Sequence, residues 1–295
     1  MPGSIGRDLV GLVPAAGRAT RISPLPCSKE LLPIGWQRDP ADATRRPKVV
    51  SQYLLERMQA AGASRVFFIV RDGKWDIARY YGDGSRLGLP IGYLNVGAPW
   101  GPPFTLSQAA PFIGDADVVF GFPDILVQPV DSFSPLLARM DTTGADVVLG
   151  LFECRADEPG DVVERHADGR VASLVTKEER PVRPDRYVCW MFAVWRASFT
   201  RFMREECGRL ARVAAARVAE DPLAKAPEWP VGAIVAAAIR AGLHVDSHFF
   251  AGGRFLDVGT PEGLTAAPAF PLVWDGLGDP AADPAAAAPA ASPSR

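Results

Sequence analysis

The first half of the chain alternates short apolar runs with amphipathic stretches. Runs such as 65–70 and 118–122 contain few polar residues, which is typical of strands buried on both faces of a sheet. The expected strands are 8–14, 65–70, 90–96, 118–122 and 145–152, and the expected helices between them are 48–61, 74–81, 104–112 and 132–142. This alternation predicts an α/β fold: a Rossmann-like, mixed but mostly parallel central sheet flanked by helices.

The pattern changes after about residue 155. Short strand-like segments separated by turns, with Asp168-Gly169 as a hairpin signal, indicate antiparallel or mixed pairing. The expected strands here are 162–164, 170–175, 187–195, 244–250 and 254–258, and the expected helices are 198–206, 209–220 and 230–241. The polar segment 35–47 is predicted to be a surface loop. Residues 271–295 are rich in Ala and Pro, with few large apolar residues, and are predicted to be disordered.

Composition and charge narrow the class of protein. A formal net charge of -2 and a pI near 6.0 provide no overall attraction to nucleic acid or to an anionic membrane. No stretch approaches the roughly 20 apolar residues that a membrane span requires. The four cysteines are widely separated and form no Cys-x-x-Cys pair, so we expect reduced thiols in a cytoplasmic protein. Three histidines, at 166, 244 and 248, have no catalytic or metal-binding spacing and are predicted to be structural or exposed.

The segment after the first predicted strand contains residues that could bind an anion. Small residues around Gly17 follow an apolar run, and the cations Arg21 and Lys29 lie in the same loop. A strand that runs into a small-residue turn presents backbone N–H groups, and nearby cations complete an anion site. The loop matches neither the Walker A pattern nor Gly-x-Gly-x-x-Gly. It therefore predicts polyphosphate binding, with two solvated surface cations as the alternative.

Two carboxylates follow predicted strands. Asp124 comes after 118–122 and Asp257 lies within 254–258. An isolated carboxylate is costly to bury unless it is paired or binds a cation, and two of them at one sheet edge suit Mg²⁺ together with substrate phosphates. Alternatively, Asp124 caps a helix and Asp257 ends a hairpin. Gln108 could read a base edge or be an ordinary surface amide, and Lys177 could be an exposed lysine in a charged turn.

Several motifs occur in a fixed order between residues 8 and 265. They are Val13-Pro-Ala-Ala-Gly-Arg-Ala-Thr-Arg21, Ser28-Lys-Glu-Leu-Leu-Pro-Ile34, Tyr81-Gly-Asp-Gly-Ser-Arg-Leu-Gly-Leu-Pro90, Leu106-Ser-Gln-Ala109, Phe120-Gly-Phe-Pro-Asp124, Val175-Thr-Lys177 and Phe255-Leu-Asp-Val-Gly-Thr260. Together they resemble the sugar-1-phosphate nucleotidylyltransferases, and within that family most closely the glucose-1-phosphate uridylyl- and thymidylyltransferases. The resemblance implies a single nucleotidyltransferase domain over residues 1–270, with a nucleotide half at 8–130 and an acceptor half at 131–265.

The resemblance also implies roles for individual residues. Arg21 would bind the β and γ phosphates, and Lys29 would stabilise charge at the α phosphorus. Asp124 and Asp257 would hold Mg²⁺. The nucleotide-binding residues would be Pro14, Ala15, Ala16, Gly17, Thr20 and Gln108, and the acceptor-binding residues would be Lys177, Asp161 and Thr176. UTP or dTTP is favoured as the nucleotide, with a guanine nucleotide left open. Dimers are common in such families, and the sequence leaves the oligomeric state open.

The sequence departs from the family pattern mainly on the acceptor side. Asp161 stands where a glycine is expected, Thr176 replaces an acid, and Arg180 competes with Lys177 as the residue that binds the acceptor phosphate. In the first loop Ala19 replaces a glycine. These departures predict an unusual acceptor, such as a modified sugar or cyclitol phosphate. Two alternatives stay open: nucleotide transfer to a non-sugar phosphate or phosphonate, and a catalytically silent nucleotide sensor.

Overall fold

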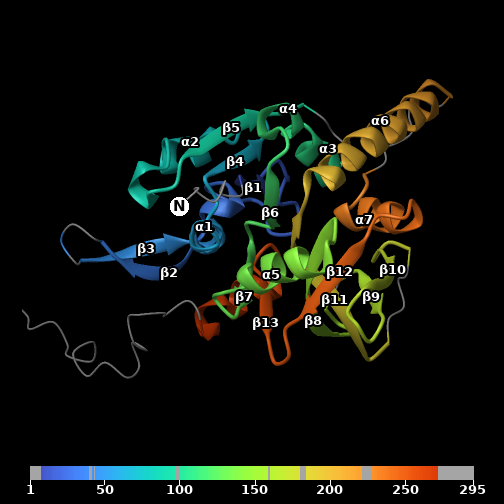
Figure 1. Cartoon of the computed structure of the whole chain (residues 1–295). Helices are drawn as coiled ribbons and strands as arrows, with labels where there is room; N and C mark the ends of the chain where they lie inside the picture. The colour runs from blue at the N-terminus through green and yellow to red at the C-terminus, as the bar shows by residue number, and fades with distance from the viewer. Residues whose placement is uncertain are drawn as a thin grey trace, which may run out of the picture.

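The protein is built around one central seven-stranded sheet (Figure 1). A computed structural model describes residues 8–39, 42, 44–97, 100–158, 160–179, 184–220 and 228–271. The strand order is β12-β8-β11-β6-β1-β4-β5. The bounds are β1 Leu9–Pro14, β4 Arg65–Val70, β5 Ile91–Asn95, β6 Asp117–Gly121, β8 Val147–Arg155, β11 Arg186–Trp195 and β12 Val245–Phe249. Strand β11 is antiparallel to β6 and β8, and the other neighbours are parallel, which confirms the predicted mixed, mostly parallel sheet.

The central strand β1 shows why its apolar run lacks alternation. Leu9 and Val13 belong to one hydrophobic cluster, whereas Val10 and Leu12 belong to another. Successive side chains of a strand point to opposite faces, so both faces of β1 are covered. A continuous apolar run is what such a strand requires.

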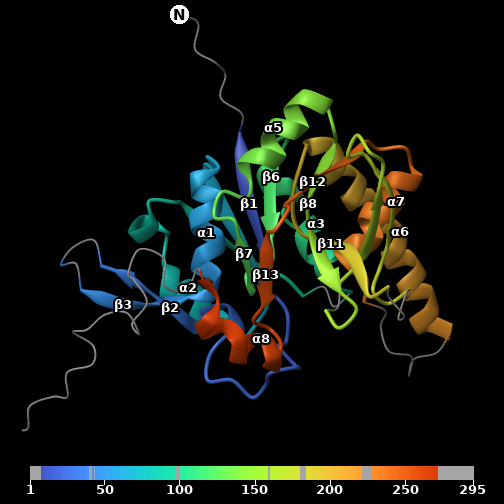
Figure 2. The same ribbon diagram turned by 90° about the horizontal axis from the view of Figure 1, so that it is seen from below.

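Different helices cover the two faces of the sheet: in the view from below, α1 and α2 lie on one side of it and α6 and α7 on the other (Figure 2). The bounds are α1 Val50–Ala60, α2 Trp75–Tyr81, α3 Pro102–Ser107, α4 Ala110–Ile113, α5 Ser134–Thr143, α6 Ala197–Glu220, α7 Val231–Arg240 and α8 Pro261–Ala266. Helices α1, α2 and α5 supply residues to the first cluster, and α3, α4, α6 and α7 supply residues to the second. No helix among the described residues is long and apolar enough to cross a membrane.

Three smaller two-stranded sheets extend the core. Strand β9 Val162–Arg165 pairs with β10 Val171–Val175, and α7 packs on this hairpin. Strand β7 Ile125–Gln128 pairs with β13 Arg254–Asp257. The third sheet joins β2 Pro33–Arg38 to β3 Arg45–Val49 and projects from the body of the protein (Figure 1).

Several predicted boundaries were wrong. The segment 35–47 contributes to the β2–β3 hairpin, and helix α1 begins at Val50 because the residues just before it pair in β3. The two helices predicted at 198–206 and 209–220 form one continuous helix, α6, which tolerates Gly208 in its interior. The predicted helix 104–112 is divided between α3 and α4. The predicted tail beyond Pro271 lies outside the described residues.

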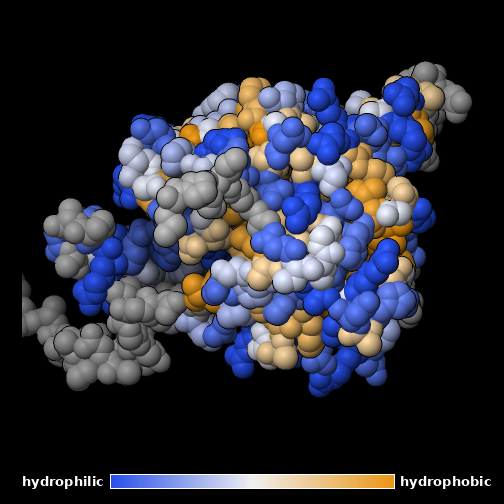
Figure 3. All heavy atoms as spheres, in the orientation of Figure 1, coloured by the Kyte–Doolittle hydropathy of each residue, from blue (hydrophilic) through white to orange (hydrophobic). Residues whose placement is uncertain are grey.

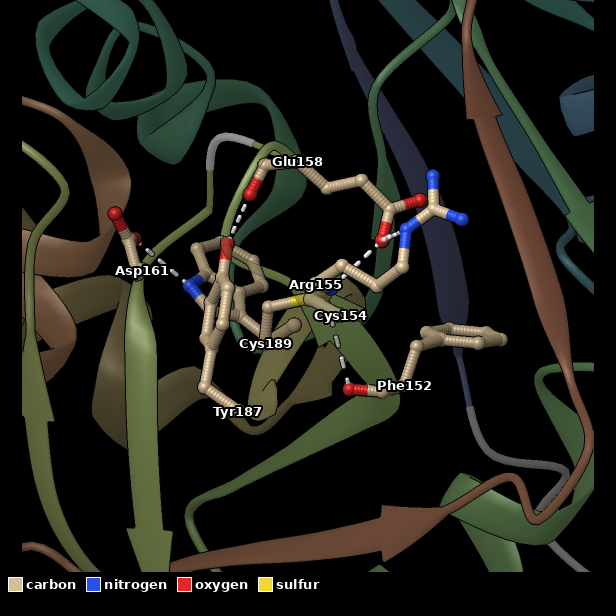
Figure 4. Close-up of a disulfide and its surroundings, with 8 residues drawn as sticks. Phe152, Cys154, Arg155, Glu158, Asp161, Tyr187 and Cys189 are labelled. Carbon is tan, nitrogen blue, oxygen red and sulfur yellow. Dashed lines mark hydrogen bonds and ion pairs between the residues drawn. A yellow bond between two sulfur atoms is a disulfide. The ribbon is translucent and has the colours of Figure 1, made fainter. Parts of the chain in front are cut away.

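The cysteine prediction is corrected by the register of two strands. Cys154 in β8 and Cys189 in β11 form a disulfide, with their Cα atoms 6.3 Å apart (Figure 4). In the antiparallel pair Cys154 lies opposite Tyr187 and Cys189 lies opposite Phe152, so the two cysteines are diagonal neighbours. Distance along the chain does not reveal such a pairing. Cys27 and Cys207 are free thiols.

Candidate active site

A cavity of about 980 Å³ lies beyond the carboxyl ends of the central parallel strands. Such sheets bind ligands at this edge, where loops from neighbouring strands meet. Loops that follow β1, β4, β5 and β6 line the cavity together with residues from the second half of the chain. Of the residues predicted from the sequence, ten line it: Pro14, Ala16, Gly17, Thr20, Arg21, Lys29, Asp124, Asp161, Lys177 and Asp257.

The loop after β1 turns sharply at Ala19. This residue has φ 54°, and it is the one non-glycine residue with positive φ in the described part of the chain. The Ala19 carbonyl accepts hydrogen bonds from Ile22 N at 3.1 Å and Ser23 Oγ at 2.9 Å. Left-handed backbone is strained for alanine and natural for glycine, which explains why the related motif has glycine here.

Buried polar contacts fix the backbone on both sides of Lys29. Asp76 in α2 accepts hydrogen bonds from Ser28 N and Ser28 Oγ, both at 2.7 Å. Glu30 is fully buried and its Oε2 lies 2.7 Å from Lys74 Nζ. A buried ion pair of this kind defines a conformation more than it adds stability. Asp76 in α2 and Lys74 at its N-terminus therefore hold the residues on either side of Lys29 in place.

Lys29 points into the cavity and meets a carboxylate there. Its Nζ atom donates to Asp124 Oδ2 at 2.5 Å, and only 17% of the lysine side chain and 8% of the aspartate side chain is exposed. Burial opposes the charged form of Lys29, but the carboxylates of Asp124, Glu30 and Asp257 together outweigh it and raise the pKa of Lys29 above its ordinary value. The lysine is therefore a permanent cation at neutral pH.

Asp257 lies beside this pair. Strand β13 places it opposite Ile125, and the Val258 N–H donates to the Asp124 carbonyl at 2.9 Å. Arg21 donates to Asp257 Oδ2 at 3.2 Å. Burial, followed by the nearby Asp124 charge, raises the pKa of Asp257, and Arg21 partly offsets this shift. Two carboxylates and two cations thus form one compact charge cluster.

The two carboxylates suit a divalent cation. A Cβ built on Gly259 would lie 2.5 Å from Asp124 Oδ2 and 3.0 Å from Asp257 Oδ1, so both oxygens face one small space. Among the described residues no group of three or more His, Cys, Asp or Glu could hold a metal ion. Mg²⁺ characteristically takes one or two carboxylates and completes its shell with water and substrate phosphates, so this donor set fits it.

Asp161 also lines the cavity. Its Oδ1 accepts from Lys177 N at 3.1 Å, and its Oδ2 accepts from the indole Nε1 of Trp190 at 2.9 Å. Burial raises the pKa of Asp161 above its usual range despite these two donors. The disulfide and the Tyr187 hydroxyl, which donates to the Glu158 carbonyl, flank the segment that leads to Asp161 (Figure 4).

Three predicted site residues lie outside the cavity lining. Ala15 is buried, and its N–H donates to the Ile69 carbonyl at 2.8 Å. Gln108 is exposed at the end of α3, and Thr105 of the same helix lines the cavity instead. Thr176 is 2% exposed and its hydroxyl donates to Glu179 at 3.0 Å. Arg180, the rival of Lys177, lies outside the described residues.

Sequence reasoning also missed several lining residues. Arg71 and Asp72 line the cavity directly after β4, at a strand end that the rule for parallel sheets could have identified. Glu228 and Trp229 line it from the segment before α7. No local sequence pattern places that segment at the cavity, since only the tertiary fold brings it there.

The chain is similar in sequence to known nucleotidyltransferases. No protein-family model matches the chain. The glucose-1-phosphate thymidylyltransferase of Streptomyces antibioticus is 30% identical over 178 residues, or 59% of this chain, and the enzyme of the same name from Streptomyces griseus is 30% identical over 177 residues. The resemblance to sugar-1-phosphate nucleotidylyltransferases is thereby confirmed. The chain matches about 45% of the length of these nucleotidylyltransferases.

A more distant sequence relative and a solved structure agree. A nucleotidyltransferase of low-salt glycan biosynthesis from Haloferax volcanii is 24% identical over 174 residues, which is 58% of this chain and 45% of that protein. A crystal structure from Bacillus anthracis, provisionally described as a glucose-1-phosphate thymidylyltransferase with sucrose bound, superposes with a TM-score of 0.70 at 16% identity. It covers 90% of this chain and 96% of its own, which supports the Rossmann-like nucleotidyltransferase fold.

Proposed function

We propose that this protein is an Mg²⁺-dependent nucleotidylyltransferase that joins an NTP to a sugar 1-phosphate or sugar-like phosphate and releases pyrophosphate. The observation that carries the proposal is the charge cluster in the cavity, where Lys29 pairs with Asp124 and Arg21 pairs with Asp257. Cations and paired carboxylates beside a small-residue loop are what a reaction between two phosphates needs. The named relatives support the same reaction class.

The residues of the first loop would handle the nucleotide. The backbone around Gly17 would contact the base and sugar, and Thr20 would contribute a hydroxyl. Arg21 would bind the β and γ phosphates through its planar guanidinium group, which suits phosphate oxygens. Lys29 would place its compact charge at the α phosphorus. UTP or dTTP is the proposed nucleotide, and the thymidylyltransferase names of two relatives favour dTTP.

Asp124 and Asp257 would hold the Mg²⁺ ion. When bound, the ion would neutralise charge on the phosphate oxygens of the nucleotide. Lys177, whose backbone N–H donates to Asp161, would bind the acceptor phosphate. We therefore assign residues 8–130 to the nucleotide and residues 131–265 to the acceptor, within one domain over residues 1–270.

The proposed chemistry is an in-line substitution. An oxygen of the acceptor phosphate attacks the α phosphorus and forms a new P–O bond, while the bond to the bridging oxygen of the β phosphate breaks and pyrophosphate leaves. The acceptor phosphate is already an anion at neutral pH, so the step needs no strong general base. Catalysis rests on alignment of the two phosphates and on charge neutralisation by Lys29 and Arg21. Because NTPs are substrates, we propose a cytoplasmic location.

A pyrophosphate-release assay over a grid of NTPs and acceptors tests the proposal. The acceptors should include glucose 1-phosphate, other sugar 1-phosphates, cyclitol phosphates and phosphonates, each with Mg²⁺ and with EDTA. Release should require an NTP, an acceptor and Mg²⁺ together. NTP binding with no release from any acceptor would instead support a silent nucleotide sensor. Efficient use of glucose 1-phosphate and rejection of all other acceptors would contradict the expectation of an unusual acceptor.

A further inference from the structure

The ends of β4 and β5 form a side of the cavity that the proposed phosphate contacts do not use. The strand order is β6-β1-β4-β5, so β4 lies two positions from the strand that leads to Asp124. Neighbouring strands are about 4.8 Å apart, which places the end of β4 roughly 10 Å from the end of β6. The phosphates would lie among Arg21, Lys29 and the two carboxylates. The side formed by β4 and β5 is therefore left for the nucleoside.

The walls on this side are mostly small or apolar. The Val96 N–H donates to the Val70 carbonyl at 2.9 Å, which brings the residues after β5 level with the end of β4. The Thr105 hydroxyl already donates to the Gly101 carbonyl at 3.4 Å, at the start of α3. A flat base can pack against such walls. The lining residues here are Val96, Gly97, Gly101, Pro102 and Thr105.

Arg71, directly after β4, has hydrogen-bond donors that the protein leaves free. Its Nη1 donates to the Asp72 carbonyl at 3.3 Å, which is the one hydrogen bond of this side chain to the described residues, and its Nε is buried without a partner. Arg21 and Lys29, by contrast, each pair with a carboxylate. A guanidinium group has five N–H donors and no acceptor. Arg71 therefore suits an acceptor atom that a ligand supplies.

Asp72 provides the complementary group beside it. The Asp72 Oδ1 atom accepts from Trp75 Nε1 at 3.3 Å, and its Oδ2 atom has no hydrogen-bond partner in the described part of the chain. A carboxylate accepts hydrogen bonds and donates none. Both Arg71 and Asp72 line the cavity. A donor-only and an acceptor-only side chain thus stand next to each other at the end of β4.

This combination matches one of the two kinds of base edge. Uracil, thymine, hypoxanthine and guanine present a carbonyl oxygen next to a ring N–H. Cytosine and adenine present an amino group next to an unprotonated ring nitrogen. With these amino bases the amino group would face the guanidinium group and the ring nitrogen would face the carboxylate, so neither contact could form a hydrogen bond.

We infer that Arg71 donates to the carbonyl oxygen, and Asp72 accepts from the ring N–H, of a keto base. The inference rests on the proposed function and specifies its nucleotide class. It also gives to Arg71 and Asp72 the contact with the base edge that the family resemblance gives to Gln108, which lies outside the cavity lining. The two residues act as specificity-determining residues for the nucleotide.

Two matched nucleotide pairs test the inference. UTP and CTP differ only at the carbonyl and ring N–H positions, and so do ITP and ATP. Titration calorimetry with Mg²⁺ and no acceptor should give a Kd at least about 10-fold lower for the keto nucleotide in one pair or both, which corresponds to about 1.4 kcal/mol. The pair that shows the preference reports the size of the ring. Ratios near 1 in both pairs would overturn the inference.

Arg71→Met distinguishes base recognition from simple charge attraction. The variant keeps the length of the side chain and removes its donors, so the keto preference should fall to about 1. A cation that only attracted phosphate would weaken all four nucleotides equally and leave the preference unchanged, and that result would overturn the inference. Arg65→Met is the control, because Arg65 starts β4 at the opposite sheet edge and pairs with Asp8. Thermal unfolding of each variant reports folding.

Asp72→Asn tests the second residue. An amide can donate to the ring nitrogen of an amino base, so this variant should also lose most of the preference. Glu228 is the other carboxylate to test, because the Trp229 N–H donates to the Trp100 carbonyl at 3.1 Å and brings that segment beside the start of α3. Glu228→Gln should keep the preference. Loss of the preference in Glu228→Gln and its survival in Asp72→Asn would overturn the assignment to Asp72.

Binding and turnover together separate this inference from the proposed function. Tighter binding of keto nucleotides with no pyrophosphate release from any acceptor would contradict the proposed function and support the inference. Pyrophosphate release with CTP and ATP at the same kcat/KM as with UTP and ITP would support the function and overturn the inference. Failure of all four nucleotides to bind would contradict both.

Discussion

Lys29 Nζ lies 2.5 Å from Asp124 Oδ2, and this contact joins the loop after β1 to the segment that follows β6. The pair links the group proposed to stabilise the α phosphorus to one of the two proposed metal ligands. Neither side chain is more than 17% exposed, so each charge depends on the other for compensation. A substitution at either residue should therefore alter the charge environment of the other.

Replacing Lys29 with alanine should lower kcat more than it weakens NTP binding. The lysine charge is needed most when charge develops at the α phosphorus, so we expect a loss on the order of 10²–10³ in kcat. The apparent KM for NTP should change by only about a few fold. Steady-state pyrophosphate release measures both. Lys48→Ala is a control, because that lysine lies in β3, pairs with Glu56 of α1 and does not line the cavity. An equal loss in affinity and none in kcat would contradict the assigned role.

Replacing Asp257 with asparagine should abolish most activity while the fold stays intact. The substitution removes a proposed Mg²⁺ ligand and preserves shape, and a loss of several kcal/mol of charge stabilisation corresponds to at least about 100-fold in rate. Activity should be measured over a range of Mg²⁺ concentrations, with circular dichroism as the folding readout. Asp115→Asn, at a side chain that is 91% exposed, is the matched control. Near wild-type activity in Asp257→Asn would make the metal assignment wrong.

Replacing Ala19 with glycine should stabilise the protein. Alanine at φ 54° carries backbone strain of about 1–2 kcal/mol, and the greater flexibility of unfolded glycine offsets part of the gain. We expect the free energy of unfolding in urea to rise by about 0.5–1 kcal/mol. Ala215→Gly, on an exposed part of α6, should instead lower it by about 1 kcal/mol. If both substitutions destabilise equally, Ala19 is not strained in solution.

Removing the Cys154–Cys189 disulfide should destabilise the acceptor half. The bridge spans 35 residues and joins neighbouring strands, and loss of such a bridge costs about 2–4 kcal/mol. The double variant Cys154→Ala/Cys189→Ala should therefore unfold at lower urea concentration than the untreated protein. Reductant should lower the unfolding midpoint of the parent and leave that of the double variant unchanged. Thiol counting by mass spectrometry tests whether the bridge is present. Four free cysteines in the folded protein would contradict the disulfide.

Local sequence patterns predicted the strands of the central sheet more accurately than the elements around the sheet. Runs such as 65–70 are apolar because both faces of the strand are covered, so the sequence alone identified them. The β2–β3 hairpin was missed because its residues are polar and partly exposed. Helix α6 was divided at Gly208 because glycine commonly ends helices, whereas packing of its apolar face on the sheet outweighs that preference.

By itself the sequence determined that a small-residue loop with Arg21 and Lys29 follows the first strand, and that Asp124 and Asp257 follow later apolar segments. These are local properties, set by the order of residues along the chain. Only the tertiary structure decided that the carboxylates meet, because the antiparallel pairing of β7 and β13 places Asp257 opposite Ile125, next to Asp124. It likewise brought Trp229 and Asp161 to the same cavity and Cys154 to Cys189. Hydrogen bonds between distant strands fix such contacts, and no local pattern encodes their register.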